Sequence, residues 1–316
     1  MNSLSTSEKA FRLLNGIVCL YKPAGVHLSG CRHSLLLKLT QELNLCGVRS
    51  PENRVVISGD TTKELNVKVE SSYADNVLVV GPRYQTQDIK CIWTTHLGKR
   101  VSGVCVIGLN KGTKMARNLQ NNYPLRTYHL HGQLGIMTKN MYIDGQVVEK
   151  GRFDFVKREN VDKLMSTIQA SNQKKMFELA NVDTQTQTAY DLATKGLIRP
   201  ASTKNPLIYG IKCISLDLPN FIIEVNVINE YESYLLSLVH EIGLKLRCSA
   251  TCTAIRCIRY SSFTIQQALL MKHWNLQYVL ENMRECNSSY KQMSQLPSFI
   301  TEQSYFESNQ KLTGIQ

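Results

Sequence analysis

A basic segment without carboxylates is the part of this sequence whose residue types point most directly to chemistry. From Ile89 to Ile143 there is no aspartate or glutamate, although a chain with 25 acids among 316 residues would place about four there. Carboxylates repel phosphates and cations attract them, so this pattern favours a surface that faces nucleic acid. A solvated basic face is the alternative, but the gap spans several apolar and polar elements, which favours the first interpretation. The segment carries eight cations: Lys90, Lys99, Arg100, Lys111, Lys114, Arg117, Arg126 and Lys139.

Charge and length limit the classes of function. The net charge is +12, from 37 basic and 25 acidic residues, and the pI is about 9.2, which suits nucleic acid or another anionic surface. A chain of 316 residues that is 43% hydrophobic can bury one large or two ordinary domains. No run of about 18 apolar residues occurs, so we expect no membrane span.

The cysteines and histidines show no metal-binding pattern. None of the ten cysteines forms a CxxC pair, and the closest group, between Cys248 and Cys257, matches no zinc template. We therefore expect buried free thiols and a reducing compartment. His96, His129 and His131 lie in the basic segment without a suitably spaced third ligand, so we interpret them as polar surface or site lining. No metal and no cofactor is predicted.

The elements that would position the basic segment follow from periodicity and turns. Thr94–Leu109 is a glycine-broken loop that runs into a buried strand. The other expected strands are Leu14–Ala24, three runs within Arg54–Gly81, Arg126–Ile136, Tyr209–Leu216, Phe221–Ile228 and Thr251–Arg259. The expected helices are Ser29–Leu45, Thr113–Asn121, Glu159–Ala170, Gln185–Lys195 and Glu230–Leu246. Strands interrupted by helices without a βαβ rhythm favour an α+β fold with a mixed sheet.

Five spaced segments together resemble a known family. They are NGI followed by KP and a glycine (Asn15–Gly25), RTY with a later glycine (Arg126–Gly135), DGQVV (Asp144–Val148), AYDLA with GLIRP (Ala189–Pro200) and LVHEIG (Leu238–Gly243). In this order they resemble the TruB-type pseudouridine synthases, and most closely the mitochondrial branch found in animals. The resemblance covers roughly residues 14–263.

The resemblance implies a reaction for which this chain lacks two residues. Isomerisation of uridine requires a base that is flipped out and an aspartate that acts as nucleophile or base. That aspartate belongs to the motif G-x-L-D-x-x-A-x-G, which aligns with Thr95–Gly103 and places Gly98 at the aspartate position. The family's arginine, in GTYIR-[ST]-L, aligns with Leu236. Asp88 and Asp144 are the nearest acids along the chain, and no rearrangement that would bring a distant carboxylate to position 98 is indicated.

The resemblance also assigns contacts with RNA. Tyr128 corresponds to the family's base-stacking tyrosine, and Tyr190 and Lys22 are further retained positions. Packing, or fixing the end of a strand, is the alternative role for each of these three. The predicted RNA-binding residues are Tyr128, Lys99, Arg100, Lys114, Arg117, Lys22 and Tyr190.

The expected architecture is a single pseudouridine-synthase domain over residues 14–263, with a mixed, mostly antiparallel sheet, flanking helices and a basic RNA-binding cleft. Residues 1–13 would be a leader or tail, and their Ser, Thr, Lys and Arg content resembles a mitochondrial presequence. Residues 264–316 would form a helical extension, with a loose end after Ser294, in place of the RNA-binding barrel of bacterial relatives.

The predicted function is a non-catalytic RNA-binding or assembly factor of the mitochondrial matrix that acts on ribosomal, messenger or transfer RNA. An active pseudouridine synthase that uses an unrecognised carboxylate is a second hypothesis, which the missing acids weaken. A protein-interaction scaffold is a third, which the retained positive charge weakens. Structured RNA is the expected partner.

Overall fold

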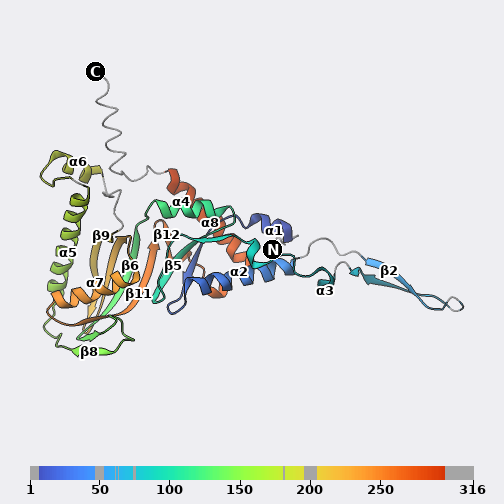
Figure 1. Cartoon of the computed structure of the whole chain (residues 1–316), viewed down its shortest axis with the longest axis horizontal. Helices are drawn as coiled ribbons and strands as arrows, with labels where there is room; N and C mark the ends of the chain where they lie inside the picture. Colours follow the sequence, from blue (N-terminus) through green and yellow to red (C-terminus); the bar gives the residue numbers. More distant parts are fainter. Residues whose placement is uncertain are drawn as a thin grey trace, which may run out of the picture.

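The computed structural model describes residues 7–46, 53–60, 62, 64–73, 76–180, 182–195 and 205–295 (Figure 1). Their largest sheet has eight strands in the order β1-β5-β11-β6-β10-β9, with β12 beside β11 and β4 beside β5. Neighbouring strands are antiparallel except β5 and β11, which are parallel. This confirms the predicted α+β fold. The strands are β1 (Gly16–Lys22), β4 (Cys91–Trp93), β5 (Val101–Leu109), β6 (Arg126–Leu134), β9 (Leu207–Asp217), β10 (Asn220–Ile228), β11 (Ala250–Tyr260) and β12 (Phe263–Thr264).

Strand β5 lies in the interior of this sheet, and the run VSGVCVIGL explains why. Nearly every residue of the run is buried, as expected for a strand covered on both faces. Helix α4 (Gly112–Asn121) packs closely on its end. A Cβ at Gly108 would lie only 2.7 Å from Cβ of Ala116, so this glycine permits the close approach.

Helix α8 (Leu276–Gln295), which packs beside α2 (Leu28–Leu45), protects the edge of the sheet at β1. The backbone N–H groups of Ile17 and Cys19 face outward from this edge strand, and they donate to side-chain oxygens of Asn287 and Asn282 at 3.0 and 2.9 Å. These asparagines satisfy donors that an exposed strand edge would leave unpaired. Helix α1 (Ser7–Leu13) packs against α2.

The opposite end of the sheet is covered by two other helices. Helix α5 (Arg158–Leu179) packs on β9, and α7 (Glu232–Lys245) packs on β11 and β6 (Figure 1). Helix α5 continues beyond its predicted end because Met176 and Leu179 contribute to a second small core with Leu207, Tyr209 and Ile228. The remaining elements on this side are α6 (Gln187–Lys195) and the hairpin of β7 (Ile136–Thr138) and β8 (Val147–Lys150).

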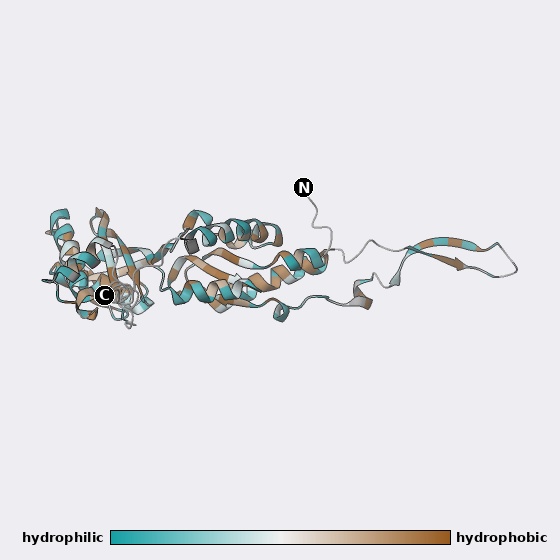
Figure 2. Cartoon of the chain, turned by 90° about the horizontal axis from the view of Figure 1, so that it is seen from above, coloured by the Kyte–Doolittle hydropathy of each residue, from teal (hydrophilic) through white to brown (hydrophobic). Residues whose placement is uncertain are grey.

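A separate β-hairpin extends away from the body of the protein (Figures 1 and 2). It consists of β2 (Asn53–Ser58) and β3 (Asn66–Ser71), which pair only with each other in the described chain. The prediction of a third strand in the region Arg54–Gly81 is wrong, because Val77–Val80 forms the short helix α3. The side chain of Asn76 accepts the N–H of Leu78 at 2.9 Å, an interaction that favours a helix start.

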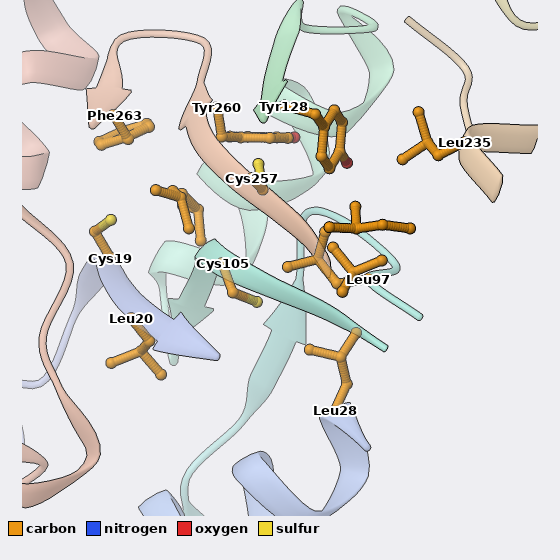
Figure 3. Packing of buried hydrophobic residues seen from close by; sticks show 14 of the residues in the cluster. Cys19, Leu20, Leu28, Leu97, Cys105, Tyr128, Leu235, Cys257, Tyr260 and Phe263 are labelled. Atoms are coloured by element: carbon orange, nitrogen blue, oxygen red, sulfur yellow. The ribbon is translucent and has the colours of Figure 1, made fainter. Parts of the chain in front are cut away.

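The cysteines lie in the core as free thiols, as predicted. All ten are unpaired, and nine are buried. Cys19, Cys105 and Cys257 pack with Phe263 and Tyr260 between the central strands (Figure 3). Burial raises the pKa of the Cys257 thiol to about 12, which keeps it protonated. Among the described helices, none has the length and apolar character needed to cross a membrane.

Candidate functional site

The loop before β5 contains Gly98 and is held in place by buried residues of the loop and by the side chain of Lys22. Thr94, Thr95 and Leu97 are buried, which anchors the loop to the core. Below it, the buried ammonium of Lys22 donates to the carbonyl oxygens of Pro23, Lys99 and Val101 at 3.1, 3.2 and 2.6 Å. Burial lowers the pKa of Lys22, and three carbonyl partners compensate for its lost hydration. Lys22 therefore supports this loop, and its ammonium is not exposed to a ligand.

Gly98 lacks a side chain for reasons of space. Its φ lies outside the left-handed region, so its backbone would accept an L residue. A Cβ built on Gly98 would nevertheless lie 2.7 Å from Cδ and 2.8 Å from Cβ of Glu232, and closer still to Oε2. Real Cβ contacts essentially never fall below 3.0 Å. The expectation that no distant carboxylate reaches position 98 is therefore wrong, because the first residue of α7 brings one there.

Arg100 holds this carboxylate in place. Its backbone N–H donates to Oε2 of Glu232 at 3.3 Å, and its Nη1 lies 3.5 Å from Oε1 of the same residue. Its Nη2 pairs with Asp144 at 3.3 Å, and the guanidinium lies over the ring of Tyr142. A single cation thus connects two carboxylates that come from separate segments of the chain. We refer to Gly98, Arg100, Tyr142, Asp144 and Glu232 as the Gly98 site.

Asp144 is held in its charged form. A hydrogen bond from Asn140 at 2.7 Å, together with the guanidinium of Arg100, keeps the pKa of Asp144 below its usual value. A carboxylate that stays ionised keeps its attraction for Arg100 over a wide range of pH. The Gly98 site therefore contains one cation and two anions, which leaves little positive charge there for a phosphate.

Leu236, which aligns with the family's arginine, and Tyr128, which aligns with its base-stacking tyrosine, are both buried. Leu236 is 5% exposed and belongs to the apolar core. Tyr128 is 2% exposed and packs among Cys257, Tyr260 and Leu235 (Figure 3). Its hydroxyl donates to Oε1 of Glu230 at 2.6 Å. Neither residue presents a face to solvent.

Glu230 forms the centre of a second buried polar group. Its Oε1 also lies 2.8 Å from Nε of Arg126, so one oxygen is shared by a cation and by Tyr128. Burial raises the pKa of Glu230, and the Arg126 charge opposes that rise. The pKa of Tyr128 is raised by burial and by the Glu230 charge, so its hydroxyl stays protonated as a donor.

Four further cations of the basic segment lie at the two ends of β5. Lys99 is exposed at the start of the strand, beside Arg100. Lys111, Lys114 and Arg117 are exposed at its end, on and around α4. In the described part of the chain, none of these four contacts a carboxylate. The predicted RNA-binding residues therefore do not form one cluster, and two of the five predicted cations, Lys114 and Arg117, belong to α4.

Tyr190 lies apart from both groups. It is 64% exposed on α6 and shares no hydrogen bond or ion pair with the Gly98 site within the described residues. The GLIRP segment that follows it, residues 196–200, lies outside the described chain. Where the structure describes the chain, no three His, Cys, Asp or Glu side chains could together hold a metal ion.

Sequence reasoning missed Glu232, although a signal was present. In the family motif GTYIR-[ST]-L the first residue is glycine, and this chain has ESYLLSL, with Glu232 in that place. A carboxylate therefore appears at the start of α7 in the same chain in which one is missing at position 98. Because the two residues lie on different elements, only the fold brings them together.

Comparison with known proteins identifies similar chains. The family model for the N-terminal domain of TruB family pseudouridylate synthases matches residues 84–233. A mitochondrial pseudouridylate synthase TRUB2 of Xenopus tropicalis is 34% identical over 291 residues, which cover 90% of this chain and 89% of that protein. The mitochondrial TRUB2 of Homo sapiens is 35% identical over 278 residues, which cover 86% of this chain and 83% of that protein.

Among solved structures, the chain resembles part of an archaeal box H/ACA sRNP Nop10–Cbf5 complex. The TM-score is 0.47 at 14% sequence identity, and the match covers 89% of this chain. The match spans 59% of the solved chain.

Proposed function

Because this chain belongs to the TruB family of pseudouridylate synthases, we propose that it binds structured RNA in mitochondria without isomerising uridine. The observation that supports the non-catalytic part is Gly98. The family's reaction requires a carboxylate there, and a glycine offers neither a nucleophile nor a base. The family's arginine position carries the buried Leu236, which cannot pair with a carboxylate or a phosphate.

The RNA-binding part is supported by the exposed cations. Lys99, Lys111, Lys114 and Arg117 have no carboxylate partner among the described residues, so their charge is available to phosphates. Structured RNA presents a dense phosphate backbone, which proteins recognise largely by shape and charge. The protein would then act as an RNA-binding or assembly factor on ribosomal, messenger or transfer RNA.

Mitochondrial location is supported by the relatives. Two of them are named as mitochondrial proteins and match most of this chain. We propose the matrix as its location. Imaging of a copy tagged at its C-terminus would test this, and a signal confined to the cytosol would contradict it.

A second candidate function is an active RNA pseudouridine synthase that uses Glu232. The specific observation in its favour is that a carboxylate with a guanidinium partner lies at position 98. Tritium release from RNA labelled at C5 of uridine separates the two functions. No release is expected from the unmodified protein, and release that disappears in Glu232→Gln would establish the second function.

A further inference from the structure

We propose that Glu232 blocks the place that a flipped-out uridine would occupy, so that RNA is bound with its bases left in their stack. This inference rests on the proposed RNA-binding function and names the residue that decides how the RNA is held. The side chain of Glu232 lies across Gly98, where Cβ and Cδ both fall within 3.0 Å of a Cβ built on that glycine. The volume left by the missing aspartate is therefore filled by this protein's own side chain.

The blocking side chain is held on three sides. Arg100 contributes a backbone N–H to Oε2 and a guanidinium to Oε1, so both oxygens have a partner. Glu232 is also the acidic residue of the first turn of α7, where the helix dipole favours negative charge. Asp144 fixes the guanidinium from its other side. The side chain of Glu232 is accordingly only 19% exposed.

Compared with the family motifs, the carboxylate and the arginine have exchanged places between the loop before β5 and α7. In the family motifs the carboxylate belongs to the loop before β5 and the arginine to α7. In this chain Glu232 on α7 supplies the carboxylate and Arg100 on the loop supplies the cation. The contact between loop and helix is thus preserved, while the group that would project toward a uridine is absent.

Two observations indicate a blocking residue in preference to a catalytic one. The Glu232 carboxylate lies at the level of a Cβ, whereas an aspartate at position 98 would extend its oxygens further from the backbone. Displacement of a reacting group by about 1 Å can reduce a rate by about a hundredfold. Tyr128 is 2% exposed, so a base would find no ring face on which to stack.

The first test uses the protein alone. Gly98→Ala should lower the melting temperature by about 5 °C, since the added Cβ overlaps Glu232. The same substitution in a Glu232→Gly background should have little effect. Glycine is required in that background because Cβ of Glu232 itself lies 2.8 Å from the new atom. Equal effects in the two backgrounds would overturn the inference.

The second test uses an RNA hairpin with one loop uridine next to 2-aminopurine, whose fluorescence rises when its neighbour leaves the stack. The unmodified protein should bind this probe without a rise, and Glu232→Gly should give a severalfold rise. Glu241→Gln, an exposed carboxylate on the same helix, is the matched control and should behave like the unmodified protein.

The possible outcomes separate the two proposals. A fluorescence rise with the unmodified protein, or tritium release that depends on Glu232, would overturn the blocking role. If no variant binds RNA, the proposed function fails, and the thermal measurements still decide whether Glu232 fills the space above Gly98.

Discussion

The two ends of strand β5 belong to one basic segment and differ in their electrostatic environment. At the start of the strand, Arg100 is paired with Asp144 and Glu232. At its end, Lys111, Lys114 and Arg117 are exposed, and no carboxylate pairs with them in the described chain. The nine residues of β5 separate the two ends by about 30 Å.

The contrast shows that a segment without acidic residues can still have carboxylates beside it in the folded protein. Asp144 and Glu232 lie outside the acid-free segment, and the fold brings both to the start of β5 and neither to its end. At the start of β5 these two carboxylates balance the charge of Arg100. Affinity for phosphates is therefore expected mainly from the cations on and around α4, with Lys99 as a further exposed cation at the start of β5.

The largest expected effect comes from rebuilding the start of β5. Loss of a nucleophile costs about 10⁶-fold in rate in a well-studied protease, so the unmodified protein should release no tritium from labelled uridine RNA. Gly98→Asp alone should fail, because the new carboxylate would overlap and repel Glu232. Gly98→Asp with Leu236→Arg should fail for the same reason.

Adding Glu232→Gly to these two substitutions should permit detectable release. The matched control replaces Gly98→Asp by Gly98→Asn in the triple variant, which keeps the shape and removes the carboxylate. If the aspartate and asparagine triples are equally inactive, substitution of these three positions is not sufficient for activity.

The second prediction concerns the end of β5. Replacing Lys111, Lys114 and Arg117 by glutamine should reduce the slope of log affinity against log salt by roughly three, because each of these cations would neutralise one phosphate. Binding of a hairpin RNA measured at several salt concentrations gives this slope. The matched control is the glutamine triple at Lys163, Lys174 and Lys175, exposed cations of α5.

Arg100→Gln sharpens the same comparison. Its guanidinium is already paired with two carboxylates, so its removal should change the salt slope by less than any single α4 substitution. If Arg100→Gln reduces the slope as much as the α4 triple, the RNA is bound at the start of β5, and our comparison of the two ends is wrong.

The third prediction compares the roles of a buried and an exposed lysine at the same loop, Lys22 and Lys99. Lys22→Met should lower the free energy of unfolding by about 3 kcal/mol, because three carbonyl groups around the buried ammonium lose their hydrogen bonds to it. Lys99→Met should change stability by less than about 0.5 kcal/mol and should weaken RNA binding. Denaturant unfolding and RNA binding, measured on both variants, test this. Equal losses of stability would contradict the supporting role of Lys22.

Much of the fold was predictable from the sequence because it depends on local pattern. Apolar and alternating runs placed six of the eight strands of the large sheet but not the short β4 and β12, and the apolar stripe Leu35, Leu39 and Leu43 placed α2. The region around α3 was not predictable from composition, because a valine-rich run without a neighbouring strand formed a helix. The family relationship, read from short motifs, is confirmed by the comparisons.

The Gly98 site was predictable only in part. The motif located Gly98 and Leu236, because both lie within matched segments. The contact between Arg100 and Glu232 joins residues 132 positions apart, and it depends on how α7 packs beside the start of β5. No periodicity encodes such a contact, so the residue that fills the site could not be inferred before the fold was known.

The smallest expected effect is a shift in the titration of Asp144. Asn140→Ala should raise the pKa of Asp144, since the hydrogen bond from Asn140 is the main cause of its low value. Arg100→Gln should also raise it, because the guanidinium lowers the pKa of Asp144 through both its charge and its hydrogen bond. Carboxyl chemical shifts followed by NMR through the acid range give both values. An unchanged pKa in both variants would mean that neither Asn140 nor Arg100 holds Asp144 in its charged form.

The hairpin of β2 and β3 has a consequence for how the polypeptide could be divided. Its apolar residues Val55, Ile57, Val67 and Val69 share one face and are exposed, and a two-stranded ribbon is marginally stable in water. A protease should therefore cut between these strands first. The two fragments should stay associated, because β1 from the first pairs along its length with β5 from the second. Expressed separately, they should reassemble, which makes this hairpin a site at which the protein can be split into complementing halves.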